Sequence, residues 1–275
     1  MEATGVALVT GAGRGIGRAL AFELARRGFE VVATLRDPSG SAALAAAARD
    51  AGVRLRIAHL DVTQPEGFAM PDGLRVLVNN AGVEAAQLPL EHAPLATWRA
   101  VFETNVFGLV ALTQLAIPKL RAAGGGVICN LGSASLLVPM PLFAAYRASK
   151  AAVAALGESL CVEVAPFGIR VLEIVPGAIA TDMLARADRA SEAGAFATYR
   201  ALAERIDRAR RAAAGAATDV ARAAAAIADA ILDDAAPLRV APDPMGAALL
   251  DAWRTQDDAT ALRAMLDAFG RAGDG

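Results

Sequence analysis

A tyrosine and a lysine, Tyr146 and Lys150, stand four positions apart in the alanine-rich stretch AAYRASKAAVAAL. Residues i and i+4 share one face of a helix, so the ammonium can lie near the phenol. A tyrosine with its ordinary pKa of about 10 exchanges protons poorly near neutral pH. Lowering that pKa to about 7 needs about 4 kcal/mol, and a positive charge about 4 Å away supplies a similar amount at an effective dielectric of about 20. The pair predicts a general acid/base, Tyr146, whose pKa is lowered by Lys150.

A glycine-rich stretch, TGAGRGIG at residues 10–17, is the second pattern with chemical meaning. Glycines let the chain turn tightly and let backbone amides approach a pyrophosphate at the N-terminus of a helix. The spacing is G-x-x-x-G-x-G through Gly11, Gly15 and Gly17, with Ile16 in place of the glycine that G-x-G-x-x-G would carry. Because the stretch follows an apolar run and opens a helix, it predicts a dinucleotide site.

The end of the second apolar run, VVATLRD, bears on which nicotinamide cofactor is used. An acid at this place holds a free ribose hydroxyl, whereas an arginine accommodates a 2′-phosphate. Leu35 is the strand-end residue and Arg36 follows it, while Arg14 lies inside the glycine loop, so two guanidinium groups can bind a phosphate. We therefore expect NADP(H). A shift of one residue in the strand end would instead offer Asp37 to the ribose of NAD(H).

The elements that must position these residues are short β-branched runs alternating with alanine- and leucine-rich segments. Continuous apolar strands between helices indicate a parallel sheet covered on both faces. We predict an α/β fold of the Rossmann type, with a doubly wound parallel sheet of seven strands and right-handed crossovers. The strands are expected at residues 5–10, 29–35, 54–60, 74–80, 126–132, 169–175 and 237–241, and helices at 15–27, 41–51, 95–122 and from about 146 onward.

The domain organisation is expected to be simple. The chain has 275 residues, 55% of them hydrophobic and 20% charged, so it can fill a large core, and no repeat or linker divides it. We predict one catalytic domain over residues 1–275. Residues 185–217 are helical, rich in Arg and Ala, and follow a strand end, where a substrate lid would lie. Residues 246–275 are expected to form a helical tail without chemistry of its own.

Several classes of partner are not expected. The net charge of −2 gives no bulk attraction to nucleic acid or anionic lipid, and no basic run is interleaved with aromatic residues. No uninterrupted apolar run approaches the roughly 20 residues of a membrane helix, and no secretory signal is visible. Cys129 and Cys161 have no second cysteine at metal or redox spacing, and His59 and His92 have no motif partners. We expect a cytoplasmic protein with no metal, nucleic-acid or membrane partner.

Further motifs follow the glycine loop in a fixed order: LDV at 60–62, NNAG at 79–82, TNVFG at 104–108, NLGSAS at 130–135, YRASK at 146–150 and PGAIAT at 176–181. In this combination the chain resembles the single-domain branch of the short-chain dehydrogenase/reductase superfamily, closely over residues 5 to about 182. The resemblance implies an oxidoreductase that transfers hydride between a nicotinamide cofactor and a CH–OH or C=O group. One departure is Gly132, where many members have a serine just before the catalytic one.

The resemblance assigns a catalytic tetrad. Asn105, Ser133, Tyr146 and Lys150 match it, and Ser133 lies thirteen residues before the tyrosine, as the family pattern requires, whereas Ser135 does not. By this resemblance Ser133 orients the substrate oxygen, Lys150 also binds the nicotinamide ribose, and Asn105 holds a water that links Lys150 to solvent.

Cofactor contacts follow from the glycine loop, the arginines and the family motifs together. By resemblance, Asp61 and Val62 contact the adenine, the NNAG turn supports the sheet and lines the cofactor, and the PGAIAT stretch borders the nicotinamide. The expected set is Gly11, Arg14, Gly15, Ile16, Gly17, Arg36, Asp61, Val62, Asn79, Asn80, Ala81, Gly82, Tyr146, Lys150, Pro176, Gly177, Ile179 and Thr181.

Apolar side chains surround the expected site and favour a hydrophobic ketone or secondary alcohol, of steroid, retinoid, terpenoid or acyl type. The same side chains are equally consistent with packing of a lid or a subunit contact, so the substrate stays open. The expected substrate contacts are Ser133, Met140, Leu142, Phe143, Tyr146 and Met183.

Two alternatives differ in class. A cofactor-sensing regulator without turnover could lose Tyr146 or Lys150 freely, yet both are present. A sugar-nucleotide enzyme would need a larger C-terminal domain than the stretch after Thr181 provides. The resemblance also implies a homodimer or homotetramer, with alanine-rich helices at 107–117 and 150–165 available for subunit packing.

Overall fold

The computed structural model describes residues 1–185 and 190–270, and these residues form one sheet of seven parallel strands in the order β3-β2-β1-β4-β5-β6-β7. The order runs outward from β1 in both directions, and the reversal between β1 and β4 is the switch point outside which α/β proteins bind ligands. The predicted Rossmann-type fold is confirmed. The strands are β1 (Val6–Val9), β2 (Glu30–Leu35), β3 (Leu55–His59), β4 (Leu74–Asn79), β5 (Gly126–Leu131), β6 (Ile169–Ile174) and β7 (Arg239–Val240).

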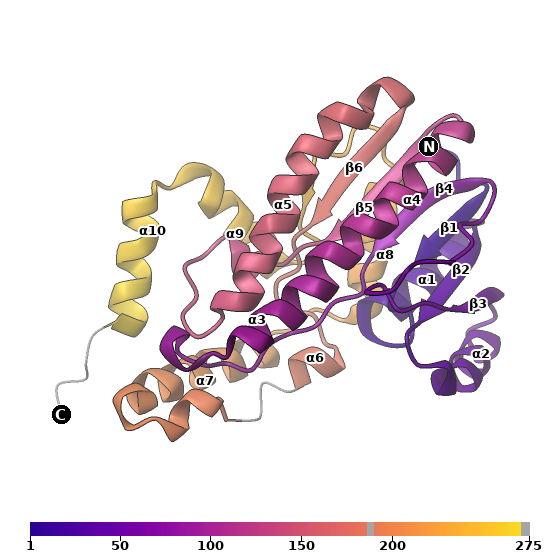
Figure 1. The fold of residues 1–275 in the computed structure, drawn as a ribbon. Coiled ribbons are helices and arrows are strands. Elements are labelled where there is room, and N and C mark those ends of the chain that lie inside the picture. The colour runs from indigo at the N-terminus through magenta and orange to yellow at the C-terminus, as the bar shows by residue number, and fades with distance from the viewer. Residues whose placement is uncertain (186–189, 271–275) are drawn as a thin grey trace.

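Helices cover both faces of the sheet, which explains why its central strands are continuously apolar (Figure 1). On one face, α1 (Gly15–Arg27) and α8 (Val220–Leu232) pack Leu20, Leu24 and Ile227 into the core. On the other face, α4 (Gly108–Ala122) and α5 (Ala144–Val164) pack Leu120, Leu160 and Val164. α2 (Ser41–Asp50) adds Leu44 to the first of these cores.

The long tract predicted at 95–122 is helical throughout but not uniform. α3 (Leu95–Phe102) passes through a π-helical turn, Glu103–Phe107, into α4. Leu95–Ala122 is long and apolar enough to cross a membrane by length and composition alone. This is weak support for a span, because a core helix meets the same criteria, and α4 buries Leu112, Ala116 and Leu120 against the sheet.

The C-terminal part combines the predicted lid with helices that turn out to contribute to the site. α6 (Asp182–Ala185) and α7 (Arg200–Gly215) fall within or beside the predicted lid at 185–217, and α7 lies near the carboxyl ends of the strands (Figure 1). α9 (Pro244–Thr255) begins before the predicted tail and lines the main cavity, so it is more than a tail. α10 (Asp258–Met265) projects away from the sheet (Figure 1).

The cysteines are not placed for redox or metal chemistry. Cys129 is fully buried in β5, and burial raises the pKa of its thiol to about 12, as for an unreactive core residue. Cys161 is half-buried in α5. Over residues 1–185 and 190–270, no group of three or more His, Cys, Asp or Glu side chains is arranged to hold a metal ion.

Candidate active site

The glycine loop makes a tight turn from β1 into α1. Gly11 and Gly15 have positive φ angles of 63° and 56°, which a residue with a Cβ rarely adopts. A Cβ on Gly17 would lie 2.3 Å from Nδ2 of Asn80, so this position needs glycine for close packing. The Asn80 amide donates to the Thr10 carbonyl at 2.8 Å and to the Gly11 carbonyl at 3.2 Å, which holds the loop in place.

The NNAG turn is tied to the same loop. Thr10 Oγ1 accepts hydrogen bonds from the backbone amides of Asn80 and Ala81, both at 2.9 Å. Asn79 is buried instead, and its Nδ2 donates to Asn130 at 2.9 Å and to Thr113 at 3.1 Å. The turn therefore has the predicted sheet-supporting contacts, but Asn79 does not line the cavity that opens at the strand ends.

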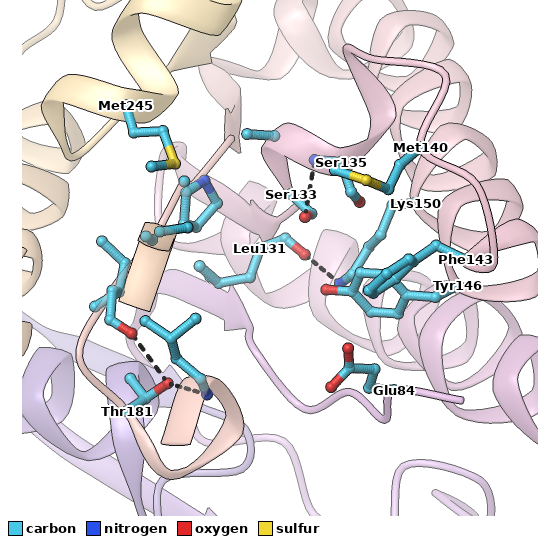
Figure 2. A pocket seen from close by; sticks show the side chains of 18 of the residues that line it. Glu84, Leu131, Ser133, Ser135, Met140, Phe143, Tyr146, Lys150, Thr181 and Met245 are labelled. Atoms are coloured by element: carbon cyan, nitrogen blue, oxygen red, sulfur yellow. Dashed lines mark hydrogen bonds between the residues drawn. The ribbon is translucent and has the colours of Figure 1, made fainter. Parts of the chain in front are cut away.

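A cavity of about 310 Å³ opens at the carboxyl ends of the strands, beside the switch point. In Figure 2, Ser133, Tyr146 and Lys150 point toward one region of this cavity, while Thr181 and Met245 lie on the opposite side. The cavity brings together Ile16, Asn80, Gly82, Ser133, Met140, Phe143, Tyr146, Lys150, Pro176, Gly177, Ile179 and Thr181 from the predicted set.

Tyr146 and Lys150 lie on the first two turns of α5. The Lys150 ammonium is 5.7 Å from the centroid of the Tyr146 ring and donates to the Leu131 carbonyl at 2.6 Å (Figure 2). The predicted proximity of the two side chains is confirmed.

The pKa values differ from the prediction. Burial raises the pKa of Tyr146 to about 12, a hydrogen bond with Ser133 lowers it, and the charge of Glu84 raises it. Burial lowers the pKa of Lys150 to about 8, and the charge of Glu173 opposes that shift. The tyrosine pKa therefore moves upward where the sequence predicted a downward shift, because removing the phenolate from water outweighs the favourable interactions.

Ser133 comes at the end of β5 and caps a short turn, with its Oγ accepting from the Ser135 amide at 3.2 Å. Its hydrogen bond with Tyr146 supports the choice of Ser133 over Ser135. Arg147, which the sequence did not single out, holds the following loop by donating to the carbonyls of Val138 at 2.7 Å and Ser135 at 3.2 Å.

Asn105 is buried in the π-helical turn, and its side chain makes hydrogen bonds to the backbone of another segment. Its Oδ1 accepts from the Val83 amide at 2.8 Å, and its Nδ2 donates to the Val83 carbonyl and to Ser149 Oγ, both at 3.0 Å. A Cβ on Gly82 would lie 3.3 Å from Asn105 Oδ1 and 3.8 Å from Lys150 Nζ. The side chain thus lies near Lys150 while holding the turn at Gly82–Val83.

One predicted substrate contact lies elsewhere, and a second cannot be placed among the described side chains. Leu142 has a positive φ of 66° and packs against Ala193, Ala203 and Ile206 of the lid region instead of lining the cavity, so its assignment is corrected. Met183 lies in α6, and its side chain is outside the part of the chain that the structure describes. Met140 and Phe143 line the cavity as predicted.

The residues expected at the adenosine end lie outside this cavity. Arg14 and Arg36 are exposed, and the glycine loop that carries Arg14 is joined to β2, which Arg36 follows, by a hydrogen bond from the Ala12 amide to the Thr34 carbonyl at 2.8 Å. Asp37 caps a turn by accepting from the Ser39 amide at 2.9 Å. Asp61 accepts from Thr63, and Val62 is buried beside Leu112.

Three side chains missed by the sequence analysis complete the site. Glu84 follows the NNAG turn and points into the cavity near Tyr146 (Figure 2). Arg210 from α7 and Met245 from α9 form other parts of the wall.

The Asp-Pro pair at the start of α9 is a signal of a helix start that is visible in the sequence. Asp243 is 5% exposed and accepts from the amides of Gly177 at 2.7 Å and Gly246 at 2.9 Å.

A family model for short chain dehydrogenases matches residues 5–192. The chain belongs to the short-chain dehydrogenase family. The match ends just beyond the part of the chain that carries the family motifs, and leaves α7 to α10 outside it.

Relatives in this family are 35–39% identical to the chain over about two thirds of its length. An uncharacterized oxidoreductase, YusZ of Bacillus subtilis, is 37% identical over 187 residues, which are 65% of this chain and 66% of that protein. Cis-4-hydroxycyclohexanecarboxylate dehydrogenase of Sinomonas cyclohexanicum is 39% identical over 66% of this chain and 75% of its own. The rabbit (Oryctolagus cuniculus) 11-beta-hydroxysteroid dehydrogenase type 2 is 35% identical, over 66% of this chain and only 46% of its own.

Solved short-chain dehydrogenases extend the likeness over nearly the whole chain. One from Streptomyces avermitilis is 31% identical with a TM-score of 0.74, covering 98% of this chain and 97% of its own. One from Burkholderia cenocepacia, in complex with NADP, is 27% identical with a TM-score of 0.74, covering 97% and 99%. One from Burkholderia phymatum, in complex with NAD, is 26% identical with a TM-score of 0.76, covering 96% of each.

Proposed function

We propose that this protein is an NAD(P)-dependent oxidoreductase that transfers hydride between a nicotinamide cofactor and a hydrophobic ketone or secondary alcohol. The observation that carries the proposal is the meeting of Ser133, Tyr146 and Lys150 in one largely apolar cavity that Ile16 of the glycine loop also lines. Family membership and the dehydrogenase names of the relatives support it.

The residues at the switch point fit a nicotinamide dinucleotide. A Cβ on Gly17 would clash with Asn80, and Gly11 and Gly15 adopt positive φ, so the backbone at the start of α1 is left free of side chains. Backbone amides at a helix N-terminus bind phosphate, and Arg14 is exposed beside them. Thr181 and Gly177 would border the nicotinamide, and Lys150 would hold its ribose. Bound there, the nicotinamide supplies or accepts the hydride.

In the reductive direction the chain's own residues donate a proton to the substrate carbonyl oxygen and orient that oxygen. Tyr146, whose pKa burial raises to about 12, is a phenol at neutral pH and can give its proton to a carbonyl oxygen. Ser133, whose hydroxyl lowers the pKa of Tyr146, would donate to the same oxygen and stabilise the negative charge that develops on it. The apolar walls from Met140 and Phe143 would exclude water from the reacting atoms.

In the oxidative direction Tyr146 must first become a phenolate. The buried environment opposes that, so positive charge near the ring has to stabilise the phenolate. Lys150 lies 5.7 Å from the ring centroid and can supply one charge, and an oxidised nicotinamide carries another. We therefore expect oxidation to be more sensitive to pH than reduction.

NADP(H) is the cofactor we favour, because Arg36 follows β2 directly and Arg14 lies in the neighbouring loop. Asp37 is engaged by the Ser39 amide, which lowers the pKa of that carboxyl together with the Ser39 hydroxyl, and it would have to serve the turn and a ribose at once. NAD(H) remains the alternative. Solved family members are in complex with either cofactor.

The organisation of the rest of the chain is part of the same proposal. We assign residues 1–275 to one cytoplasmic catalytic unit in which α7 serves as the lid, since Arg210 and Ala213 contribute to the cavity wall. A homodimer or homotetramer would cover the exposed side chains of Phe107, Leu115 and Val162 around α4 and α5.

A screen of ketones and secondary alcohols, following the absorbance of NADPH and NADH in turn, tests the proposal. Turnover of a cyclic or polycyclic alcohol or its ketone is expected, with NADPH or NADP⁺ preferred. Cofactor binding without turnover of any compound would favour a cofactor-sensing regulator, whereas failure to bind either cofactor would contradict the proposal as a whole.

A further inference from the structure

A row of polar side chains crosses the sheet near its carboxyl edge, on the side of α5. Neighbouring strands pair Asn79 with Asn130, Asn130 with Glu173, and Glu173 with Arg239. Residues paired in this way point to the same face of a sheet. The face is the one that α5 covers, because a Cβ on Gly157 would lie 3.9 Å from Nδ2 of Asn130.

Glu173 is the carboxylate in this row, and only one of its oxygens is neutralised locally. It is 1% exposed, and its Oε2 accepts from Nε of Arg239 at 2.7 Å. Arg239 also pairs with Glu158 and lies over the ring of Trp253, 4.9 Å from its centroid. Oε1 of Glu173 accepts no hydrogen bond from the described residues. A buried carboxylate oxygen without such a bond is costly unless positive charge lies close by.

Lys150 of the active site is a positive charge that acts on Glu173: burial raises the pKa of that carboxyl, and the charges of Arg239 and Lys150 lower it. Lys150 is 6% exposed, and its ammonium donates to the carbonyl of Leu131, the residue before Gly132 (Figure 2). Oε1 of Glu173 lies 3.3 Å from where a Cβ on Gly132 would be. Both charged groups therefore approach the end of β5, one from α5 and one from β6.

This arrangement explains why residue 132 is a glycine. A serine, which many family members have here, would place its Cβ 3.3 Å from Oε1 of Glu173 and 2.8 Å from the Ile174 carbonyl. Glycine leaves the space beside the strand end to the carboxylate.

We propose that Glu173 is a positioning residue of the active site: it is the buried counter-charge that keeps Lys150 protonated and its ammonium at the end of β5. The inference rests on the proposed function only for its consequence in catalysis, since a protonated Lys150 is what the ribose contact and the phenolate both require. The effect of Glu173 on the pKa of Lys150, upward against the lowering by burial, agrees with this assignment.

The other charged groups around the pair are few. Arg239 from β7 and Glu158 from α5 face Glu173. On the cavity side, Tyr146 from the same helix faces Lys150, and Glu84 from the loop after β4 faces Tyr146. Burial raises the pKa of Glu173 and the charge of Glu158 adds to that rise, but Glu158 is not among the charges that shift the pKa of Lys150. Glu158 is therefore a matched control.

The chain has only two lysines, Lys119 and Lys150, so the protonation of Lys150 can be observed directly. Protein labelled with ¹³C at the lysine ε-carbon gives two side-chain signals, which the Lys119→Arg variant assigns. In the Glu173→Gln variant we expect the titration midpoint of Lys150 to fall by about one pH unit or more, because an opposite charge within about 12 Å contributes at least about 1.4 kcal/mol at an effective dielectric near 20. Glu158→Gln and Glu173→Asp, which keep a carboxylate at position 173, should leave the midpoint within a few tenths of a unit of the wild-type value.

Arg239 keeps Glu158 and the Trp253 ring in the Glu173→Gln variant, so we expect that variant to fold. If it does not, Glu173→Thr, which suits a strand and also lacks the carboxylate, takes its place with the same expected shift. An unchanged Lys150 midpoint in the folded variant lacking the carboxylate, or an equal shift in Glu158→Gln, would overturn the proposal. The readout needs neither cofactor nor substrate, so its outcome is independent of whether the screen finds turnover.

Discussion

Tyr146 and Arg36 both lie where strands of the sheet end, yet their surroundings differ in one decisive respect. Lys150 and Glu173 are buried and Tyr146 is half-buried, and removal from water is the main cause that raises the pKa of the phenol to about 12 and lowers that of the ammonium to about 8. Arg36, Arg14 and Asp37 are exposed to water. A charge in the first region must be matched by another charge, whereas a charge in the second is screened.

This difference predicts how strongly each region responds to substitution. In the buried region, a single group changes protonation or orientation for its neighbours, and the consequences are large. In the exposed region, hydrogen bonds to a ligand compete with water and salt, and each contributes less. The following changes test that contrast, in order of expected effect.

Replacing Tyr146 with Phe removes the proposed proton donor without changing the apolar wall. We expect kcat to fall by about 10²–10⁴-fold, the range for loss of general acid–base catalysis, with cofactor affinity nearly unchanged. Single-turnover rates and fluorescence titration with NADPH measure the two quantities. Tyr199→Phe is the matched control, because Tyr199 is the other tyrosine and lies in the lid region. Retained turnover in Tyr146→Phe would remove the catalytic assignment.

Asp243 lies outside the family motifs, and it tests whether substitution of a buried residue there also has a large effect. Ala at this position removes a helix cap and leaves the Gly177 amide without its acceptor. We expect unfolding in urea to cost about 2 kcal/mol less than for the wild type, and the KM for cofactor to rise while kcat changes little. Asp257→Ala removes the exposed cap of α10. We expect it to lower the free energy of unfolding by less than Asp243→Ala does and to leave the KM for cofactor unchanged. Equal losses for both variants would contradict the contrast between buried and exposed sites.

Glu84 tests the sign of the electrostatic effect on Tyr146. Its charge raises the pKa of the phenol, so Glu84→Gln should lower that pKa, by up to about one unit. In a Tyr199→Phe background Tyr146 is the only tyrosine, and tyrosinate absorbance follows its titration. Glu91→Gln is the control, because Glu91 raises the pKa of Tyr199 instead. If the titration midpoint of Tyr146 stays the same or rises in Glu84→Gln, the charge of Glu84 does not raise the pKa of the phenol.

The same contrast explains what could be predicted from the sequence. The strands, the glycine turn and the proximity of Tyr146 to Lys150 depend on local pattern: alternation of apolar runs with helices, positive φ at glycine, and the i, i+4 spacing of a helix. Each can be deduced from neighbours in the chain. The sheet order then brings the strand ends together without further information.

The missed features depend on contacts between distant segments. The bond from Gly177 to Asp243 spans 66 positions, and the roles of Glu84 and Glu173 depend on which groups burial places beside them. The upward pKa shift of Tyr146 could not be predicted for the same reason, since a charge–charge estimate omits the cost of taking the phenolate out of water. Leu142 was misassigned because its positive φ turns it toward the lid.

Arg36 gives the smallest and most discriminating test, at the exposed end. If the 2′-phosphate of NADP(H) is held there, Arg36→Ser should weaken NADPH binding by about fivefold, corresponding to about 1 kcal/mol for an exposed charge pair, and leave NADH binding unchanged. The difference between wild type and variant should shrink as salt is raised, because exposed charges are screened within about 10 Å at 0.1 M ionic strength. Asp37→Asn, which keeps a side-chain acceptor for the Ser39 amide, should leave both affinities as they are. A variant Asp37→Asn that loses NADH affinity while Arg36→Ser keeps NADPH affinity would reverse the cofactor assignment. It would do so without touching the buried region, because Arg36 and Asp37 are exposed and lie outside the cavity that Tyr146 and Lys150 line.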